Sequence, residues 1–167
     1  RFRVGIANNL PKLVAHHLMS PACRVAGYPV HLVCLQDKEA ALVAQMVGHH
    51  LDIVLTDRAV GLVREVGLES RVLGDCAVSL MATPKLAARY LSGFPQSLEG
   101  APLLLPEPGA SMRVRVEEYF HQLGLRPHVV AESGETELLK TFGQAGMGIF
   151  PVPSLVVAEV SAQCNVI

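Results

Sequence analysis

The sequence predicts an α/β fold of two similar lobes, each a mixed sheet flanked by helices. A long-range repeat supports this prediction most strongly, because residues 33–56 align without a gap with residues 129–152, at a constant offset of 96. Each copy reads as a strand, a polar turn, a helix and a second strand, and Ile53 falls on Ile149. The short, continuously apolar run at 51–56 is typical of a buried parallel strand. Right-handed crossovers then place helices on both faces of each sheet.

The first lobe is expected to have the order strand, helix, strand, helix, strand. The predicted strands cover residues 3–7, 28–35 and 51–56, and the predicted helices cover 10–25 and 39–47. Asn8 and Asn9 form the turn before the first helix, Pro11 suits its first turn, and Asp37 is expected to cap the second helix. Residues 58–69 read as a polar connection.

The second lobe is expected to repeat this order with one extra helix. The predicted strands cover residues 71–73, 77–82, 103–105 and the two strands of the repeat, and the predicted helices cover 83–91, 112–123, the repeat helix and 155–161. Ser111 and Ser154 are expected to cap helices, and Gly124 to end one. The tail at 162–167 shows no evident partner. We place lobe I at residues 1–77 and lobe II at residues 78–167.

Composition excludes several classes of protein. Half of the 167 residues are hydrophobic and 17% are charged, which excludes a disordered chain. The net charge of −1 gives no basic footprint for nucleic acid, so DNA contact would need another segment. No apolar run reaches 18 residues and no signal peptide is evident, so neither a membrane span nor export is expected. The four cysteines are far apart and are interpreted as buried thiols without a disulfide framework.

Four polar turns are predicted to meet the carboxyl ends of strands, each directly before a helix. Helix N-termini present free backbone N–H groups there, and ligands of α/β sheets bind at this edge. Plain helix capping explains any one turn, whereas four turns facing a cleft between two lobes indicate ligand binding. The candidate ligand-binding residues are Asn8, Asn9, Gln36, Asp37, Thr56, Ser111, Ser133 and Gly134. An anion would use the N–H groups, and a cation would use side-chain and main-chain oxygens.

Catalytic and metal sites are not predicted. The seven histidines include the adjacent pairs 16–17 and 49–50, and neighbours on a helix point in different directions, so neither pair forms a two-ligand site. The sequence contains no G-x-S-x-G, no phosphate-binding loop and no G-x-G-x-x-G after the first strand. We therefore expect no enzyme, no catalytic residue, no bound metal and no cofactor.

The residues resemble those of a known family. The run Leu-Asp-Ile-Val-Leu-Thr-Asp at 51–57 is similar to the third strand of the effector-binding domain of LysR-type transcriptional regulators, and residues 138–149 resemble its late helix–glycine–strand segment. The resemblance covers essentially the whole chain. It implies a periplasmic-binding-protein-like fold, a small-molecule or ion effector, and a cytoplasmic homodimer or tetramer. It also implies antiparallel, side-by-side dimers built from the first helix and the second strand.

A narrower resemblance comes from residues 103–112 and 117–120, which are similar to the branch of the family that activates sodium/proton antiporter genes. It implies that sodium is sensed together with pH. The family's winged helix-turn-helix and most of its closing segment have no counterpart in these 167 residues. We therefore expect DNA to be bound only through an N-terminal domain outside this sequence, and we expect no membrane contact.

Two other classes share these lobes. A solute-binding protein of a transporter is the alternative reading, and an enzyme such as a dehydratase is the third. The absence of a signal peptide argues against the former, and the absence of a positioned base and nucleophile argues against the latter. Sequence upstream of Arg1 would separate the three, because a helix-turn-helix indicates a regulator and a signal peptide or lipobox indicates transport.

Overall fold

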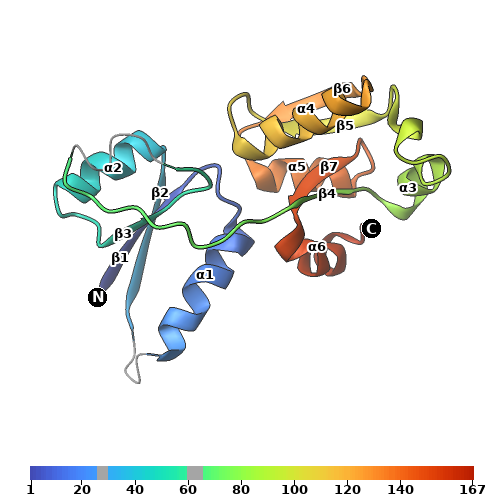
Figure 1. Ribbon diagram of the computed structural model, residues 1–167. Helices are drawn as coiled ribbons and strands as arrows, with labels where there is room; N and C mark the ends of the chain where they lie inside the picture. Colours follow the sequence, from blue (N-terminus) through green and yellow to red (C-terminus); the bar gives the residue numbers. More distant parts are fainter. Residues whose placement is uncertain (26–29, 60–65) are drawn as a thin grey trace. The chain divides into compact units, whose positions relative to one another are not determined.

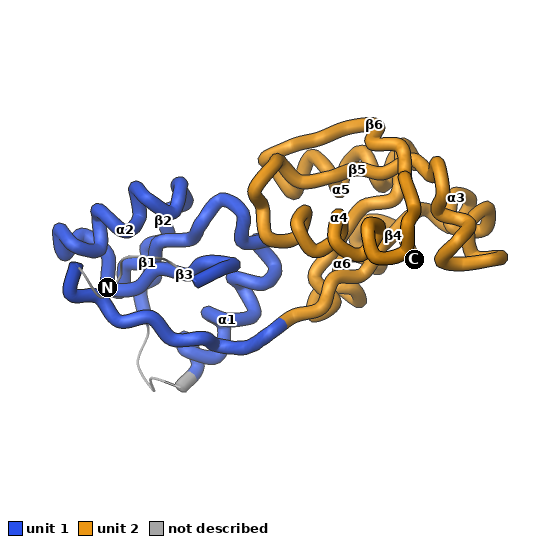
Figure 2. The backbone as a smooth tube through the Cα atoms, turned by 45° about the horizontal axis from the view of Figure 1, so that its top comes forward, with its two compact units in different colours: residues 1–75 blue, residues 76–167 orange. Residues whose placement is uncertain are grey.

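A computed structural model describes residues 1–25, 30–59 and 66–167. The chain divides into two compact units, which we call unit 1 (residues 1–75) and unit 2 (residues 76–167) (Figure 2). The sequence placed the boundary after residue 77, whereas unit 1 ends at Asp75. Each unit is described below by itself.

Unit 1 is a three-stranded parallel sheet with a helix on each face (Figure 1). Its strands pair in the order β2-β1-β3. The elements are β1 (Phe2–Ala7), α1 (Lys12–Val25), β2 (Leu32–Asp37), α2 (Glu39–Val47) and β3 (Ile53–Leu55).

The two helices of unit 1 bury opposite faces of its sheet. Val4 points into a cluster with Leu10, Ala15 and Met19 from the α1 side, whereas Ala7 packs with Leu42 and Leu51 from the α2 side. This follows from the period of two along a strand. Gly5 faces α2, and a Cβ there would lie 2.8 Å from Leu51 Cδ1 and 3.0 Å from Leu42 Cδ2. Glycine therefore lets α2 approach the sheet closely.

Unit 2 contains a parallel pair, β5 (Pro102–Pro106) with β6 (His128–Ser133), and an antiparallel pair, β4 (Val78–Met81) with β7 (Phe150–Pro153). Ile149, directly before β7, also bridges Leu103 of β5 in parallel. The helices are α3 (Pro84–Tyr90), α4 (Ser111–Leu123), α5 (Thr136–Gln144) and α6 (Val157–Cys164), with short 3₁₀ turns at Gln96–Leu98 and Ser154–Val156.

The core of unit 2 joins α3, α4 and β5. Leu86, Leu103, Leu105, Val116 and Phe120 belong to one buried cluster. On the α5 side, Phe150 is 1% exposed, and a Cβ at Gly143 of α5 would collide with its ring. The close approach of α5 to β7 therefore depends on the missing side chain at position 143.

The repeat predicted from the sequence is present in the structure. β2 and β6 are offset by 96 residues at both ends, and α2 and α5 correspond to within one residue of that offset. In each copy, the same kind of main-chain hydrogen bond joins the carboxyl ends of two neighbouring parallel strands. The Asn8 N–H donates to the Asp37 carbonyl oxygen (3.0 Å), and the Glu107 N–H donates to the Ser133 carbonyl oxygen (3.1 Å).

Several local predictions were wrong. Residues 71–73 form no strand and are exposed, because nothing in the described chain pairs with them. The second strand runs Leu32–Asp37 rather than 28–35, and positions 28 and 29 lie outside the described residues. The tail has a partner, since Ile167 and Ala82 exchange two backbone hydrogen bonds of 2.9 Å and Val166 is buried.

The predicted caps were also wrong in detail. Lys38, not Asp37, is the N-cap of α2, and Ala110, not Ser111, is the N-cap of α4. Ser154 opens a 3₁₀ turn, and α6 begins three residues later at Val157. Gly124 does end α4, with the positive φ of 67° that favours glycine.

The cysteines are free thiols, but only Cys164 is buried. Cys34 is exposed because β2 is an edge strand, so the apolar run around it did not indicate burial. Among the described residues, no helix is both long and apolar enough to cross a membrane.

Candidate functional site

The three parallel strands of unit 1 end at one edge of its sheet, which we call the unit 1 edge. In the strand register Ala7 lies opposite Asp37 and Ile6 lies opposite Leu55. The residues that end or follow these strands are therefore neighbours. Of the predicted ligand-binding residues, this edge collects Asn8, Asn9, Gln36, Asp37 and Thr56.

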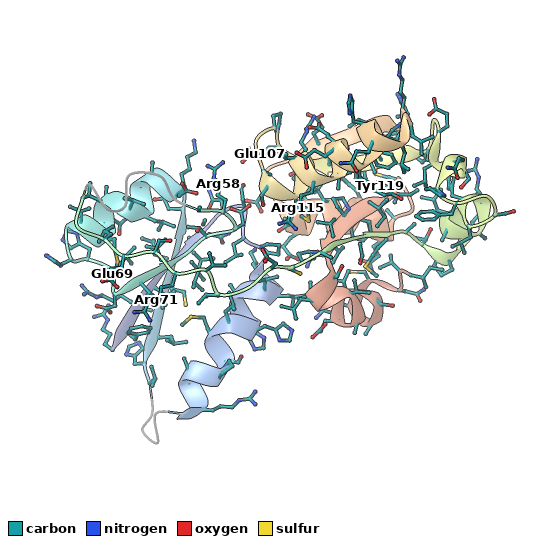
Figure 3. All side chains as sticks on the ribbon, viewed as in Figure 1. Arg58, Glu69, Arg71, Glu107, Arg115 and Tyr119 are labelled. Atoms are coloured by element: carbon teal, nitrogen blue, oxygen red, sulfur yellow. The ribbon has the colours of Figure 1, made fainter. Side chains whose placement is uncertain are left out.

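Side chains of the unit 1 edge bind the local backbone. Asp37 Oδ1 accepts a hydrogen bond from the Lys38 N–H (2.7 Å), and Thr56 Oγ1 donates to the Arg58 carbonyl oxygen (2.7 Å). Arg58 Nε in turn donates to Glu39 Oε2 (3.0 Å), which raises the pKa of the guanidinium (Figure 3). The end of β3 is thus connected to the first turn of α2.

The parallel strands β5 and β6 form the corresponding unit 2 edge, with Pro106 opposite Ser133. Ser133 ends β6, Gly134 follows it, and Ser111 is the first residue of α4. Ser133 Oγ accepts a hydrogen bond from the Glu135 N–H (2.9 Å). All three predicted residues of the second lobe therefore lie at the turns that follow β5 and β6.

Glu107 belongs to the unit 2 edge, and the sequence analysis missed it (Figure 3). It follows β5 directly, and its carboxylate lies against Gly134, where a Cβ would be 2.9 Å from Glu107 Oε2. The sequence signal for Glu107 was its place in the Pro-Glu-Pro-Gly turn at 106–109, directly after a predicted strand. Only Ser111, two residues after this turn, was predicted to bind the ligand. Because Glu107 is exposed, its oxygens face solvent at this edge.

Arg113 was also missed. Its Nη1 donates to the Pro106 carbonyl oxygen (3.0 Å) and contacts Glu132 Oε1 (2.9 Å), while its Nε donates to Glu117 Oε1 (2.7 Å). The bonds to Glu132 and Glu117 raise the pKa of this guanidinium, with Glu132 contributing most. Only 13% of the side chain is exposed.

Helix capping does not account for most of the polar turns. The N-cap residues of α2, α4 and α5 are Lys38, Ala110 and Glu135, and none makes a side-chain capping bond. In α3, by contrast, Thr83 Oγ1 accepts from the Leu86 N–H. Three of the helices that begin at the edges, α2, α4 and α5, thus lack the side-chain cap that α3 has.

The edges carry unpaired negative charge. Within the described ranges, the carboxylates of Asp37, Glu107 and Glu135 have no ion-pair partner. The described part of the chain also holds no group of three or more His, Cys, Asp or Glu side chains arranged for a metal ion. A cation at these edges would therefore be held by mixed side-chain and main-chain oxygens.

Another concave surface in unit 2 lies away from this edge. A shallow, mainly apolar groove is lined by Leu103, Phe120, His121, Leu125 and Val129, among others. It lies along the C-terminal half of α4, and none of the predicted ligand-binding residues lines it. The predicted residues therefore gather at two edges, one in each unit, and their contact with a single ligand stays a prediction.

Polar turns at the carboxyl ends of parallel strands are where α/β folds commonly bind ligands. The chain belongs to the LysR substrate binding domain family, whose model matches residues 3–167. This confirms the family that the sequence resemblance indicated.

The curated relatives are transcription regulators. The chain is 29% identical to transcriptional activator protein NhaR of Escherichia coli (strain K12) over 166 residues, which are 99% of this chain and 54% of the relative. It is 27% identical to the HTH-type transcriptional regulator CbbR of Rhodospirillum rubrum over 148 residues, 88% of this chain and 47% of the relative. The chain thus spans about half the length of the relatives it matches.

Solved structures confirm the predicted fold class. The Synechocystis PCC6803 CcmR regulatory domain in complex with 2-PG superposes with a TM-score of 0.61 at 16% identity, covering 99% of this chain and 78% of that chain. The bromide-bound regulatory domain of HypT from Salmonella typhimurium gives a TM-score of 0.68 at 14% identity, covering 99% and 76%. At these identities the likeness shows the fold alone.

Proposed function

We propose that this chain is the effector-sensing domain of a bacterial transcription regulator of the LysR type. An effector bound at these edge residues favours one conformational state of the domain by differential affinity, and that bias changes transcription. The observation that carries the proposal is the family match along the whole chain, together with the polar edge that the repeat places in each unit. The relatives found favour a regulator over a solute-binding protein or an enzyme.

DNA binding belongs to another part of the regulator in this proposal. The net charge of −1 gives the chain no excess of positive charge for the phosphate backbone, on which protein–DNA affinity largely depends. The 167-residue chain should therefore give no sequence-specific band shift at low salt with promoter DNA. A sequence-specific band shift would contradict the proposal that another part of the regulator binds DNA. A regulator acting on DNA in a bacterium works in the cytoplasm, which we propose as its location.

The charge of the edges favours a cation as the effector. Asp37, Glu107 and Glu135 contribute negative charge without an ion-pair partner among the described residues, and hard cations prefer oxygen ligands. The similarity to NhaR, with the sodium sensing that the sequence resemblance implies, points to sodium. We propose sodium as the effector, held by oxygens of the edge residues.

Replacement of Asp37 by Asn separates the two kinds of effector. For sodium, the change replaces a charged oxygen ligand with a neutral amide and weakens binding. For an anion, it removes like charge and leaves affinity intact or improved. Calorimetric titration with sodium chloride, against potassium chloride at equal ionic strength, measures this on wild type and Asp37→Asn.

Glu69→Gln is the matched control, because Glu69 is a highly exposed carboxylate far along the chain from both edges. It should bind sodium like the wild type. If neither wild type nor Asp37→Asn gave a binding signal with either salt, sodium would be excluded as the effector. A ligand found bound away from the edge residues would show that this site assignment is wrong.

We also propose that the domain forms a homodimer through α1 and β2, as the family resemblance implies. β2 and β6 are edge strands of their sheets, and they leave Leu35, Val129 and Val130 between 37% and 38% exposed. An apolar edge strand pairs readily with another chain. Sedimentation at micromolar concentration should show a dimer that Leu35→Lys dissociates, whereas a strictly monomeric wild type would contradict the proposal.

A further inference from the structure

The guanidinium of Arg113 connects the two strands of the unit 2 edge near their carboxyl ends, at the last residue of β5 and the next-to-last residue of β6. Pro106, whose carbonyl oxygen it binds, is followed directly by Glu107. Glu132, whose carboxylate it binds, is followed directly by Ser133. A planar guanidinium presents its donors in a rigid fork, so two acceptors bound to it have a fixed spacing. Arg113 therefore fixes how far apart the two turns begin.

Burial makes this brace more than a surface ion pair. Exposed pairs contribute little because water screens them and both side chains lose freedom. Arg113 is 13% exposed and has three acceptors, one each from β5, β6 and α4. Loss of the guanidinium would leave the Pro106 carbonyl oxygen without this donor beneath α4. Such a group is costly to leave unsatisfied.

The fold itself does not require the brace, as unit 1 shows. Pro11 and Ala110 accept the equivalent first bonds of α1 and α4, from Ala15 and Val114. Val14 thus occupies the place of Arg113, and it packs against the apolar cluster of unit 1. Unit 1 therefore starts the equivalent helix without a guanidinium at this position, and its edge arginine, Arg58, binds Glu39 of α2 instead. A guanidinium that binds both strands from the helix after the first of them is described for unit 2 alone.

We propose that Arg113 is a positioning residue of the unit 2 edge. It holds the ends of β5 and β6 so that Glu107, Ser133 and Gly134 keep one arrangement, and it does so without touching the ligand. The consequence for ligand binding rests on the proposed function. The effect of Arg113 on how rigidly the edge is held does not rest on the proposed function, because it can be measured in the free protein.

Amide hydrogen exchange measured by NMR tests the order of the edge directly. The Glu107 N–H bonds the Ser133 carbonyl oxygen, and the Glu135 N–H bonds Ser133 Oγ, so both amides report the turns. In Arg113→Met both should exchange roughly tenfold faster than in wild type, the factor of about one net hydrogen bond. The Leu104 N–H, bonded to Ile149 in the core, should change much less.

One further variant, one amide of unit 1 and one control variant test whether the effect is specific to the Arg113 guanidinium. Arg113→Lys keeps the charge but not the fork, so its edge amides should stay faster than wild type, and complete rescue by lysine would overturn the fork argument. The Asn8 amide of unit 1 should be unchanged. Arg115→Met, which removes a donor to the Cys76 carbonyl oxygen from the same helix, should leave Glu107 and Glu135 unchanged.

If the Leu104 and Glu107 amides exchanged faster by the same factor in Arg113→Met, the role of Arg113 would be merely structural and the proposal would be overturned. Unchanged exchange at both amides would also overturn it. The ligand consequence is measured with sodium chloride by calorimetry, where Arg113→Met should weaken the apparent Kd by roughly tenfold. If wild type does not bind sodium, the proposed effector fails while the exchange result still decides the role of Arg113. Wild-type affinity in an Arg113→Met protein with a disordered edge would contradict the ligand consequence.

Discussion

Unit 1 and unit 2 build the same strand–turn–helix edge, but the arginine that joins two of their strands lies at opposite ends of the sheet. Another arginine of unit 1, Arg58, joins the end of β3 to α2. In unit 1, Arg3 and Asp52 meet at the amino-terminal end, where Arg3 Nη2 lies 2.7 Å from Asp52 Oδ1. In unit 2, Arg113 and Glu132 meet at the carboxyl end, next to the turns. The parallel strands and apolar helix faces are what both units share, so these determine the fold. The charged pairs differ between the units in their position and in their partners.

The largest effects are expected from truncation of the two cores. Leu42 in unit 1 and Leu104 in unit 2 are both fully buried, and each Leu→Ala change should cost about 2–5 kcal/mol in the free energy of unfolding. If the units are separate cooperative bodies, Leu42→Ala should accelerate amide exchange in unit 1 and spare unit 2, and Leu104→Ala should do the reverse. Uniform acceleration throughout the chain after either change would show that the comparison of two units is wrong.

A smaller effect is expected from Gly134→Ala. The new Cβ would lie 2.9 Å from Glu107 Oε2, so the exposed and flexible Glu107 side chain should move away at a cost of about 0.5 kcal/mol. Removing the carboxylate first, in Glu107→Ala, should abolish that cost. Chemical denaturation of the two single variants and the double variant gives the coupling. A coupling of zero would contradict the contact between Glu107 and Gly134.

The Arg3–Asp52 pair at the amino-terminal end of the unit 1 sheet should make the stability of unit 1 depend on pH. Hydrogen bonds from the Arg3 guanidinium and N–H lower the pKa of Asp52 from 3.8 to about 2. A carboxyl with a lowered pKa in the folded state stabilises the fold above its unfolded pKa and loses that contribution as pH falls through the folded value. Unit 1 should therefore lose this stabilisation between pH 3.8 and about 2.

The measurement is thermal unfolding against pH for wild type and Asp52→Asn. The variant should be slightly less stable near neutral pH, and its melting temperature should fall less steeply in that acid range. Both side chains of the pair are about one third exposed, so the effect is the smallest of the three. Parallel pH profiles for the two proteins would contradict the pairing.

The sequence predicted the elements with strong periodicity and failed where long-range partners decide. The repeat located β2, α2, β6 and α5 to within a few residues because apolar faces and polar turns have a clear period. Residues 71–73 contain two adjacent apolar residues but have no pairing strand in the described chain, and the terminal Ile167 pairs with Ala82, 85 positions earlier. Neither outcome can be read from neighbours in the chain.

The candidate site shows the same limit. Strand ends and small polar residues indicated Asn8, Asp37 and Ser133, because these signals are local. Glu107 and Arg113 were missed because their roles come from contacts across elements, with Gly134 in one case and with Pro106 and Glu132 in the other. A charged residue near a turn is usually a solvated one, so only the fold distinguishes these two.

An effector is proposed to bind at these edge residues, and amide chemical shifts during a sodium chloride titration would test this proposal. Potassium chloride at equal ionic strength serves as the reference. We expect saturable shifts concentrated at Asn8, Asp37, Ser133 and Gly134. Shifts that grow linearly without saturation, or that gather along the α4 groove around Phe120 and His121, would contradict it.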